Sequence, residues 1–284
     1  MHQIEPGIYY EDSFPGVTLG ALIFSHGIIM IDAPLRAEDA RSWRSTLNSM
    51  GSSANRVLVN LDAHLDRTLG ARALDATIIA HLRTAQVFRN RPTIFKGHTL
   101  ESGAEWEVSN DVLGNRWAIP DITFSNRMNF HWGGPEVILE HHAGPAMGSI
   151  WVILPDPKII FVGDTILLDQ PPFLASADLG TWIESLEVLL SSYKDYLLIS
   201  GRGGPVAGEA VKVQLKNLRT ILKGMDRLAK KNAPPEATEE LIAGVLSNMD
   251  LPPKRREHYL QRLRHGLYYY YARRYRPIES YEQD

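Results

Sequence analysis

The sequence predicts an α/β fold that is laid out in two successive halves. Short apolar runs alternate with amphipathic helical stretches in each half. Charged residues follow three of these runs, at residues 62–67, at Asp164 and at Arg202. The 284 residues are 44% hydrophobic and 22% charged, which is typical of a globular protein. This length allows one large core, or one core with an appendage.

The first half reads as strands followed by helices. Residues 21–33 contain two apolar runs joined by a His-Gly step, which predicts a β-hairpin. Residues 37–51 carry apolar side chains at helical spacing and end in glycine, which predicts a helix. Residues 56–61 predict a short buried strand. Residues 67–88 predict a helix followed by another strand.

The second half repeats this logic. Residues 135–167 contain three apolar runs, and the Pro-Asp-Pro-Lys segment at 155–158 predicts a turn between two of them. Residues 179–193 predict a helix, and residues 196–200 a strand. Residues 209–231 predict a long amphipathic helix whose basic face we interpret as solvated.

The C-terminal part is predicted to be helical. Residues 232–237 resemble a linker, and a Pro-Pro break separates two helices after Thr238. We therefore expect a domain over 1–231 and a helical extension over 232–284 packed on it. The tyrosine-rich stretch at 266–275 indicates packing or a homodimer contact, rather than a surface for nucleic-acid stacking.

Composition excludes several function classes. The net charge of -3 argues against a nucleic-acid partner. With no cysteine, any metal must be held by His, Asp or Glu. The N-terminus has no signal-peptide pattern, and no apolar stretch reaches the roughly 20 residues that span a membrane. We therefore expect a cytoplasmic protein with no membrane partner.

Five short segments follow one another in a distinctive order. They are IIMIDAPL, which contains Asp32, then LDAHLDRTLG (61–70), HAGPAMGS (142–149), LPDPKIIFVGDT (154–165) and SGRGGPV (200–206). Their order and spacing over residues 4–230 resemble the metallo-β-lactamase fold superfamily. The resemblance implies an αβ/βα four-layer sandwich, with the C-terminal helices as an extension. It also implies a hydrolase with a metal site at the strand ends.

The resemblance further implies which positions of this chain match the metal ligands. The first-metal positions are Asp62, His64 and Pro145; the second-metal positions are Asp66, Arg67 and Arg202; Asp164 matches the bridging aspartate. Only His64, Asp66 and Asp164 keep the family's residue. Asp62 can still coordinate a metal, but proline and arginine have no lone pair to give. Asp32 is expected to brace loops near the site.

Our hypothesis is that Arg67 and Arg202 occupy the second-metal position and pair with Asp66 and Asp164. Three carboxylates would then face two guanidiniums, which nearly balances the charge without an ion. Asp62, His64 and Asp164 could still hold one divalent metal, namely Zn, Mn or Fe. His64 is otherwise a hydrogen-bonded structural histidine. We do not assign His142 as a ligand, and we interpret His81, His98 and His131 as structural or surface residues.

Three functions remain open. The first is a hydrolase of an ester, thioester, lactone or phosphoester with at most one metal. There, Asp66 would orient the water or act as the base, and Arg67 or Arg202 would hold an anionic substrate or an oxyanion. The second is a metal-free, non-catalytic relative that binds a small anionic ligand through Arg67 and Arg202. The third is a nuclease, which the charge balance and the absence of an inserted domain disfavour.

Overall fold

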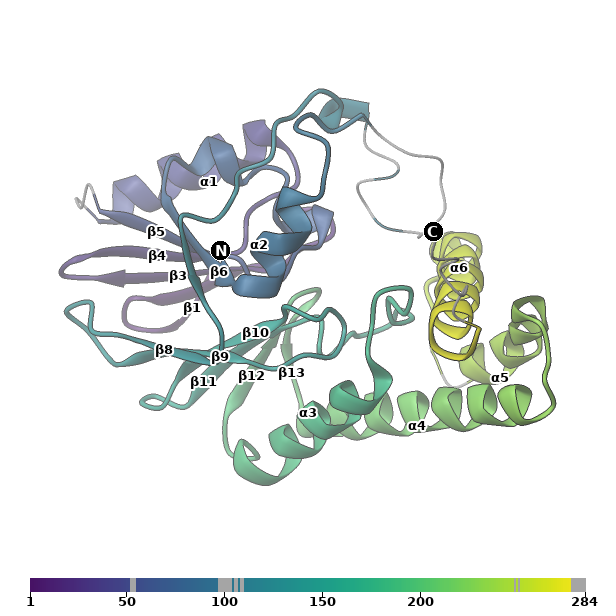
Figure 1. Cartoon of the computed structure of the whole chain (residues 1–284). Coiled ribbons are helices and arrows are strands. Elements are labelled where there is room, and N and C mark those ends of the chain that lie inside the picture. The colour runs from purple at the N-terminus through teal and green to yellow at the C-terminus, as the bar shows by residue number, and fades with distance from the viewer. Residues whose placement is uncertain are drawn as a thin grey trace, which may run out of the picture.

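The computed structural model describes residues 1–51, 55–96, 104, 107, 110–247, 249 and 251–276. His98 lies outside these residues. Two β-sheets pack face to face, and helices cover their outer faces (Figure 1). The predicted αβ/βα sandwich with C-terminal helices is therefore confirmed.

The first sheet has seven strands in chain order. They are β1 (His2–Glu5), β2 (Ile8–Glu11), β3 (Leu19–Phe24), β4 (Gly27–Ile31), β5 (Arg56–Val59), β6 (Thr77–His81) and β7 (Ile122–Phe124). The pairs from β4 to β7 are parallel. Helix α1 (Ala37–Met50) makes the crossover between β4 and β5, and a parallel pair needs such a connection.

The second sheet has six strands. Their order is β13 (Gly204–Val206), β12 (Leu197–Ser200), β11 (Ile159–Gly163), β10 (Ile150–Leu154), β9 (Val137–His141) and β8 (Arg127–Phe130). Helix α3 (Leu179–Ser192) connects β11 to β12, which are parallel. Because β5, β11 and β12 all end at the same side of the sandwich, the polar residues that follow them converge there.

Side-chain alternation explains why each sheet has two apolar faces. In β5, Val57 and Val59 join the cluster between the two sheets, whereas Leu58 joins the cluster beneath α1. Trp43 and Leu47 of α1 lie in that second cluster and are almost fully buried. A strand buried on both faces reads as a continuous apolar run, which is how β5 appears in the sequence.

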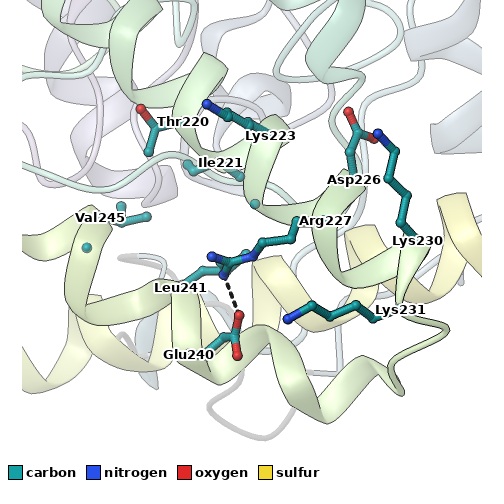
Figure 2. A pocket seen from close by; sticks show the side chains of 12 residues that line it. Thr220, Ile221, Lys223, Asp226, Arg227, Lys230, Lys231, Glu240, Leu241 and Val245 are labelled. Carbon is teal, nitrogen blue, oxygen red and sulfur yellow. Dashed lines mark hydrogen bonds and ion pairs between the residues drawn. The ribbon is translucent and has the colours of Figure 1, made fainter.

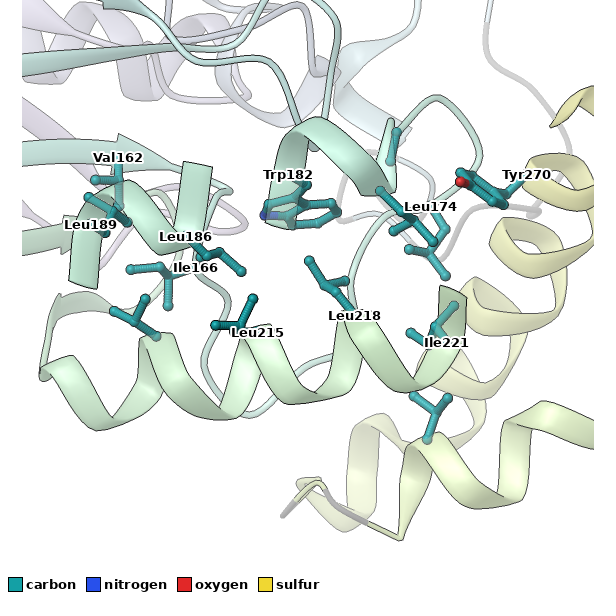
Figure 3. Close-up of a cluster of buried hydrophobic side chains, with 14 of the residues drawn as sticks. Val162, Ile166, Leu174, Trp182, Leu186, Leu189, Leu215, Leu218, Ile221 and Tyr270 are labelled. Carbon is teal, nitrogen blue, oxygen red and sulfur yellow. The ribbon is translucent and has the colours of Figure 1, made fainter. Parts of the chain in front are cut away.

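A third cluster binds the second sheet to the C-terminal half of the chain. Figure 3 shows Val162 beside Leu189 of α3, in one buried cluster with Trp182 of α3 and Leu218 of α4 (Gly208–Lys230), and with Tyr270 of α6 (Arg256–Tyr275) at one end. The same cluster includes residues of α5 (Ile242–Leu246). The C-terminal helices therefore share a core with α3 and α4, although the division at residue 231 stays a prediction.

Residues 67–88 fold differently from the prediction. In place of a helix followed by a strand, the chain forms 3-10 turns, η1 (Leu65–Arg67) and η2 (Ala71–Leu74), then β6, then helix α2 (Leu82–Arg89). Asp75 ends η2 in the left-handed region, with φ of 53°. The ring of His81 caps α2 by accepting from the backbone N–H of Arg83 at 3.2 Å.

Other elements are short or peripheral. Strands β7, β8 and β13, which have three or four residues each, were not predicted individually. Three 3-10 segments complete the fold: η4 (Asn110–Val112), η5 (Pro235–Leu241) and η6 (Pro253–Arg255). Within the described part of the chain, every helix falls short of the length and apolarity needed to cross a bilayer.

Candidate functional site

The six site residues predicted from the sequence lie together at the ends of the strands. Asp62, His64, Asp66 and Arg67 follow β5, Asp164 follows β11, and Arg202 follows β12. Five of the six are buried, and the side chain of His64 retains 24% of its exposure. The structure therefore brings all six residues together in one cluster.

Arg67 is the centre of the arrangement and has no exposed surface. Its Nη1 donates to Asp32 Oδ2 at 3.1 Å, and its Nη2 donates to Asp164 Oδ1 in a short contact. Its Nε lies 3.4 Å from Asp62 Oδ1, which is an ion-pair contact without hydrogen-bond geometry. One guanidinium thus meets three carboxylates.

Arg202 closes the other side of the cluster. Its Nε lies 3.2 Å from each oxygen of Asp164, and its Nη1 donates to Asp66 Oδ2 at 2.8 Å. Its Nη2 lies 3.0 Å from Nδ1 of His64. Because guanidinium nitrogens only donate, Nδ1 of His64 must be the acceptor. The predicted pairing of the two arginines with Asp66 and Asp164 is present.

Two glycines make room for the guanidinium of Arg67. A Cβ on Gly201 would lie 2.8 Å from both terminal nitrogens of Arg67 and 2.6 Å from the carbonyl carbon of Gly163. Gly163 itself has φ of 61°, which favours glycine. The strand ends therefore approach each other closely enough for one arginine to reach both sheets.

Asp32 is a partner that the sequence analysis undercounted. Its Oδ1 accepts from the backbone N–H of Leu61 at 2.9 Å, so it braces the site loop as predicted. It also pairs with Arg67. The predicted balance of three carboxylates to two guanidiniums is therefore wrong, because four carboxylates face the two arginines. Its position directly after β4, beside β5, was the signal for this contact.

The carboxyl groups respond differently to burial. Burial raises the pKa of Asp32 to about 7, because Arg67 offsets only part of the desolvation. Burial also raises the pKa of Asp62. For Asp164, burial acts upward, but Arg202 and Arg67 outweigh it and hold the pKa well below its usual range.

Burial and neighbouring charges also shift the pKa values of Arg67 and His64. Burial lowers the pKa of Arg67, but the carboxylates of Asp164, Asp62 and Asp32 more than offset it. Burial, assisted by the positive charge of Arg202, lowers the pKa of His64 to about 3. His64 is therefore a neutral ring at physiological pH, in agreement with its role as acceptor.

A loop and the C-terminal helix cover the cluster. The ring of Phe173 lies between two guanidiniums, 4.6 Å from Arg202 and 3.8 Å from Arg262 of α6, and 4.4 Å from the ring of His64. Arg262 Nη1 also donates to Gln170 Oε1 at 2.9 Å. Sequence reasoning missed Phe173 and Arg262, because nothing in their local pattern links them to the strand ends.

The donor set does not fit a metal ion. Nδ1 of His64 and both oxygens of Asp164 already face guanidinium N–H groups. Oδ1 of Asp62 accepts from the backbone N–H of His64 at 2.7 Å. No group of three His, Asp or Glu side chains in the described part of the chain is placed to share an ion. The two guanidiniums supply the positive charge that buried carboxylates need.

The remaining histidines have other partners. His142 stacks on Trp151 at 3.4 Å between ring centroids and contacts Glu140 at 2.8 Å, so it stands apart from the cluster. His81 stacks on His141 at 3.8 Å and caps α2, which agrees with a structural role. His131 is exposed.

The sequence matches a known family over about half its length. Residues 63–201 match the sequence model described as the metallo-beta-lactamase superfamily. This range holds four of the six predicted site residues, and the other two, Asp62 and Arg202, lie directly outside its ends. No curated protein sequence matches the chain.

Solved structures share the fold at low sequence identity. A metallo-beta-lactamase from Pontibacter korlensis is 18% identical, with a TM-score of 0.62, over 77% of this chain and 97% of that one. The inverting sec-alkylsulfatase Pisa1 from Pseudomonas sp. is 17% identical, with a TM-score of 0.64, over 96% of this chain. This chain spans 49% of the sulfatase's length. The likeness to the sulfatase therefore extends into the C-terminal helices.

Proposed function

Residues 63–201 belong to the metallo-β-lactamase superfamily and the sandwich carries that hydrolase fold, and on this premise we propose that the chain is a metal-independent relative. In this proposal, Arg67 and Arg202 replace the family's ions with fixed cations. The chain then performs no metal-dependent hydrolysis and acts as a binding protein.

One observation carries this proposal. The donor atoms that would have to coordinate a metal are occupied by arginine N–H groups, through contacts from Arg67 to Asp164 and from Arg202 to Asp66, Asp164 and His64. A divalent ion would have to displace a buried guanidinium and leave it beside another positive charge. Truncating one partner of such a buried pair typically costs about 3–5 kcal/mol, so displacement is strongly opposed.

In this proposal, a small anionic ligand contacts His64 instead of the two arginines. Arg67 is fully buried, so it cannot reach a ligand as the sequence analysis expected. Since Nδ1 of His64 accepts from Arg202, the neutral ring carries its proton on Nε2. This partly exposed imidazole can donate to a carboxylate, sulfate or phosphate oxygen. The positive charge of Arg202, which contacts the ring, would attract the same anion.

The competing function is a one-metal hydrolase. It would use Asp62, His64 and Asp164 as ligands and Asp66 as the base. The observation that best supports this function is at Asp62, whose contact with Arg67 lacks hydrogen-bond geometry and therefore holds this carboxyl group less tightly. Such a site would require Arg202 to leave both His64 and Asp164.

Hydrolysis assays separate the two functions. Protein purified without chelators would be tested on ester, thioester, lactone and phosphoester substrates, with added Zn²⁺, Mn²⁺ or Fe²⁺ and with chelator. We expect no metal-stimulated turnover and no change of melting temperature with chelator. Metal-dependent turnover that is lost in both Asp62→Ala and His64→Ala would establish the one-metal hydrolase instead.

A further inference from the structure

A cavity of about 680 Å³ lies away from the candidate site, between α4 and the helical turns η5 and α5 (Figure 2). Pockets that hold small molecules usually have volumes of about 300–1,000 Å³. The residues of α4 and its C-cap that line it recur at helical spacing and share one face: Thr220, Ile221, Lys223, Gly224, Asp226, Arg227, Lys230 and Lys231.

The floor of this groove is apolar. Ile221 of α4 and Val245 of α5 are almost fully buried, and Leu241 also lines the groove. Gly224 allows the close approach, because a Cβ there would lie 2.7 Å from Cδ2 of Leu241. Gly244 also lines the groove and has open space beside it, since a Cβ there would meet no atom within 4 Å. The groove can therefore accept an apolar body.

The rim of the groove is basic. Arg227 forms an ion pair with Glu240, and the two side chains meet across the groove in Figure 2. Lys223, Lys230 and Lys231 also line the groove, and they form no ion pair within the described part of the chain. Among the described residues that line the groove, Glu240 and Asp226 are acidic, and Asp226 accepts from the hydroxyl of Tyr275 at 2.6 Å.

We propose that this groove binds a small organic anion with an apolar body. Four cationic side chains against two acidic ones leave an excess of positive charge over an apolar floor. The positive charge favours binding of an anion and disfavours binding of an organic cation. A neutral apolar molecule would be stabilised only by its contact with the apolar floor. From the sequence, the basic face of α4 is interpreted as solvated. In this proposal, that face forms one side of a binding groove, and η5 and α5 form the other side.

Calorimetric titration with octanoate tests the proposal on the full chain. We expect saturable binding at a single site, and binding of 1-octanol, which has the same chain length without the charge, weaker by about tenfold. Equal binding of octanoate and 1-octanol would overturn the anionic specificity. Absence of saturable octanoate binding would overturn the site.

Variants locate the binding. Gly244→Leu should abolish octanoate binding by filling the groove, and Lys223→Glu with Lys231→Glu should weaken it by about tenfold. Gly208→Leu and Lys216→Glu are matched controls, because both positions lie on α4 outside the groove and Gly208 also has no atom within 4 Å of an added Cβ. Octanoate binding unchanged in the groove variants would place the site elsewhere. Circular dichroism confirms that each variant is folded.

Discussion

The guanidinium of Arg67 has no exposed surface and faces the carboxyl groups of Asp32, Asp62 and Asp164. Arg67→Met keeps the apolar stem but leaves these groups without their shared cation. We expect this variant to lose about 3–5 kcal/mol of unfolding free energy, measured by urea denaturation. Arg219→Met, which breaks an exposed pair with Glu187, should lose less than about 1 kcal/mol. Similar losses in both variants would contradict a central role for Arg67.

The pH dependence of stability separates His64 from Asp32. The pKa of His64 falls from 6.5 to about 3 on folding, so only the unfolded chain gains this proton as the pH falls below 6.5. The stability advantage of wild type over His64→Gln should therefore shrink between pH 7 and pH 4.

Asp32 should show the opposite sign. Its pKa rises from 3.8 to about 7, so the folded chain takes up this proton first as the pH falls, and that uptake stabilises the fold. The advantage of wild type over Asp32→Asn should therefore grow between pH 7 and pH 4. Thermal unfolding at several pH values measures both differences, and a common sign would contradict the assigned pKa directions.

Much of the site could be predicted at the residue scale, because its residues directly follow apolar runs. Asp62, His64, Asp66 and Arg67 lie within six positions of one strand end. The role of Asp32 as an ion-pair partner depends on strand order, because β4 pairs with β5 and so brings Asp32 beside the loop that follows β5. Arg262 lies on α6, far along the chain from Arg202, so only tertiary packing brings it to Phe173.

At the scale of elements, Phe173 joins the site loop to α6 by lying between Arg202 and Arg262. Phe173→Leu removes both cation–π contacts and keeps an apolar side chain. We expect a loss of about 1–2 kcal/mol and faster amide hydrogen exchange in η1. Tyr269→Leu is the control, because Tyr269 lies on α6 and is 49% exposed. Unchanged exchange in η1 would show that the loop and α6 do not cover the cluster.

The elements that were predicted correctly are those with a strong period. Helix α1 has its apolar residues at helical spacing and ends at a glycine, and β5 is a continuous apolar run. The prediction of a helix after residue 67 was wrong because this segment folds as 3-10 turns around buried Arg67, and tertiary ion pairs outweigh its helical propensity.

At the scale of the whole molecule, the C-terminal helices share one apolar cluster with α3 and α4. Leu263, Leu267 and Tyr271 of α6 are fully buried in it. We expect scanning calorimetry to show a single cooperative transition, because neither part keeps its core alone. Ending the chain at residue 231 should expose Met225 and Leu228 and cause aggregation. Two separate transitions would show that 232–284 folds independently.

A homodimer contact through the tyrosine-rich stretch stays a prediction. Tyr268 and Tyr269 of α6 are 37% and 49% exposed, so they are available to a second copy. Sedimentation velocity of wild type and of Tyr268→Lys with Tyr269→Lys would decide it. A dimer that dissociates in the double variant supports the contact, and a monomeric wild type rules it out.

The metal content of the wild-type chain, measured by inductively coupled plasma mass spectrometry, tests the replacement of ions by arginines most directly. Protein purified without chelators should carry far less than one metal ion per chain. Arg67→His with Arg202→His, analysed alongside, should gain a zinc ion, because two imidazoles then join Asp66 and Asp164. A stoichiometric metal ion in the wild-type chain would contradict the account.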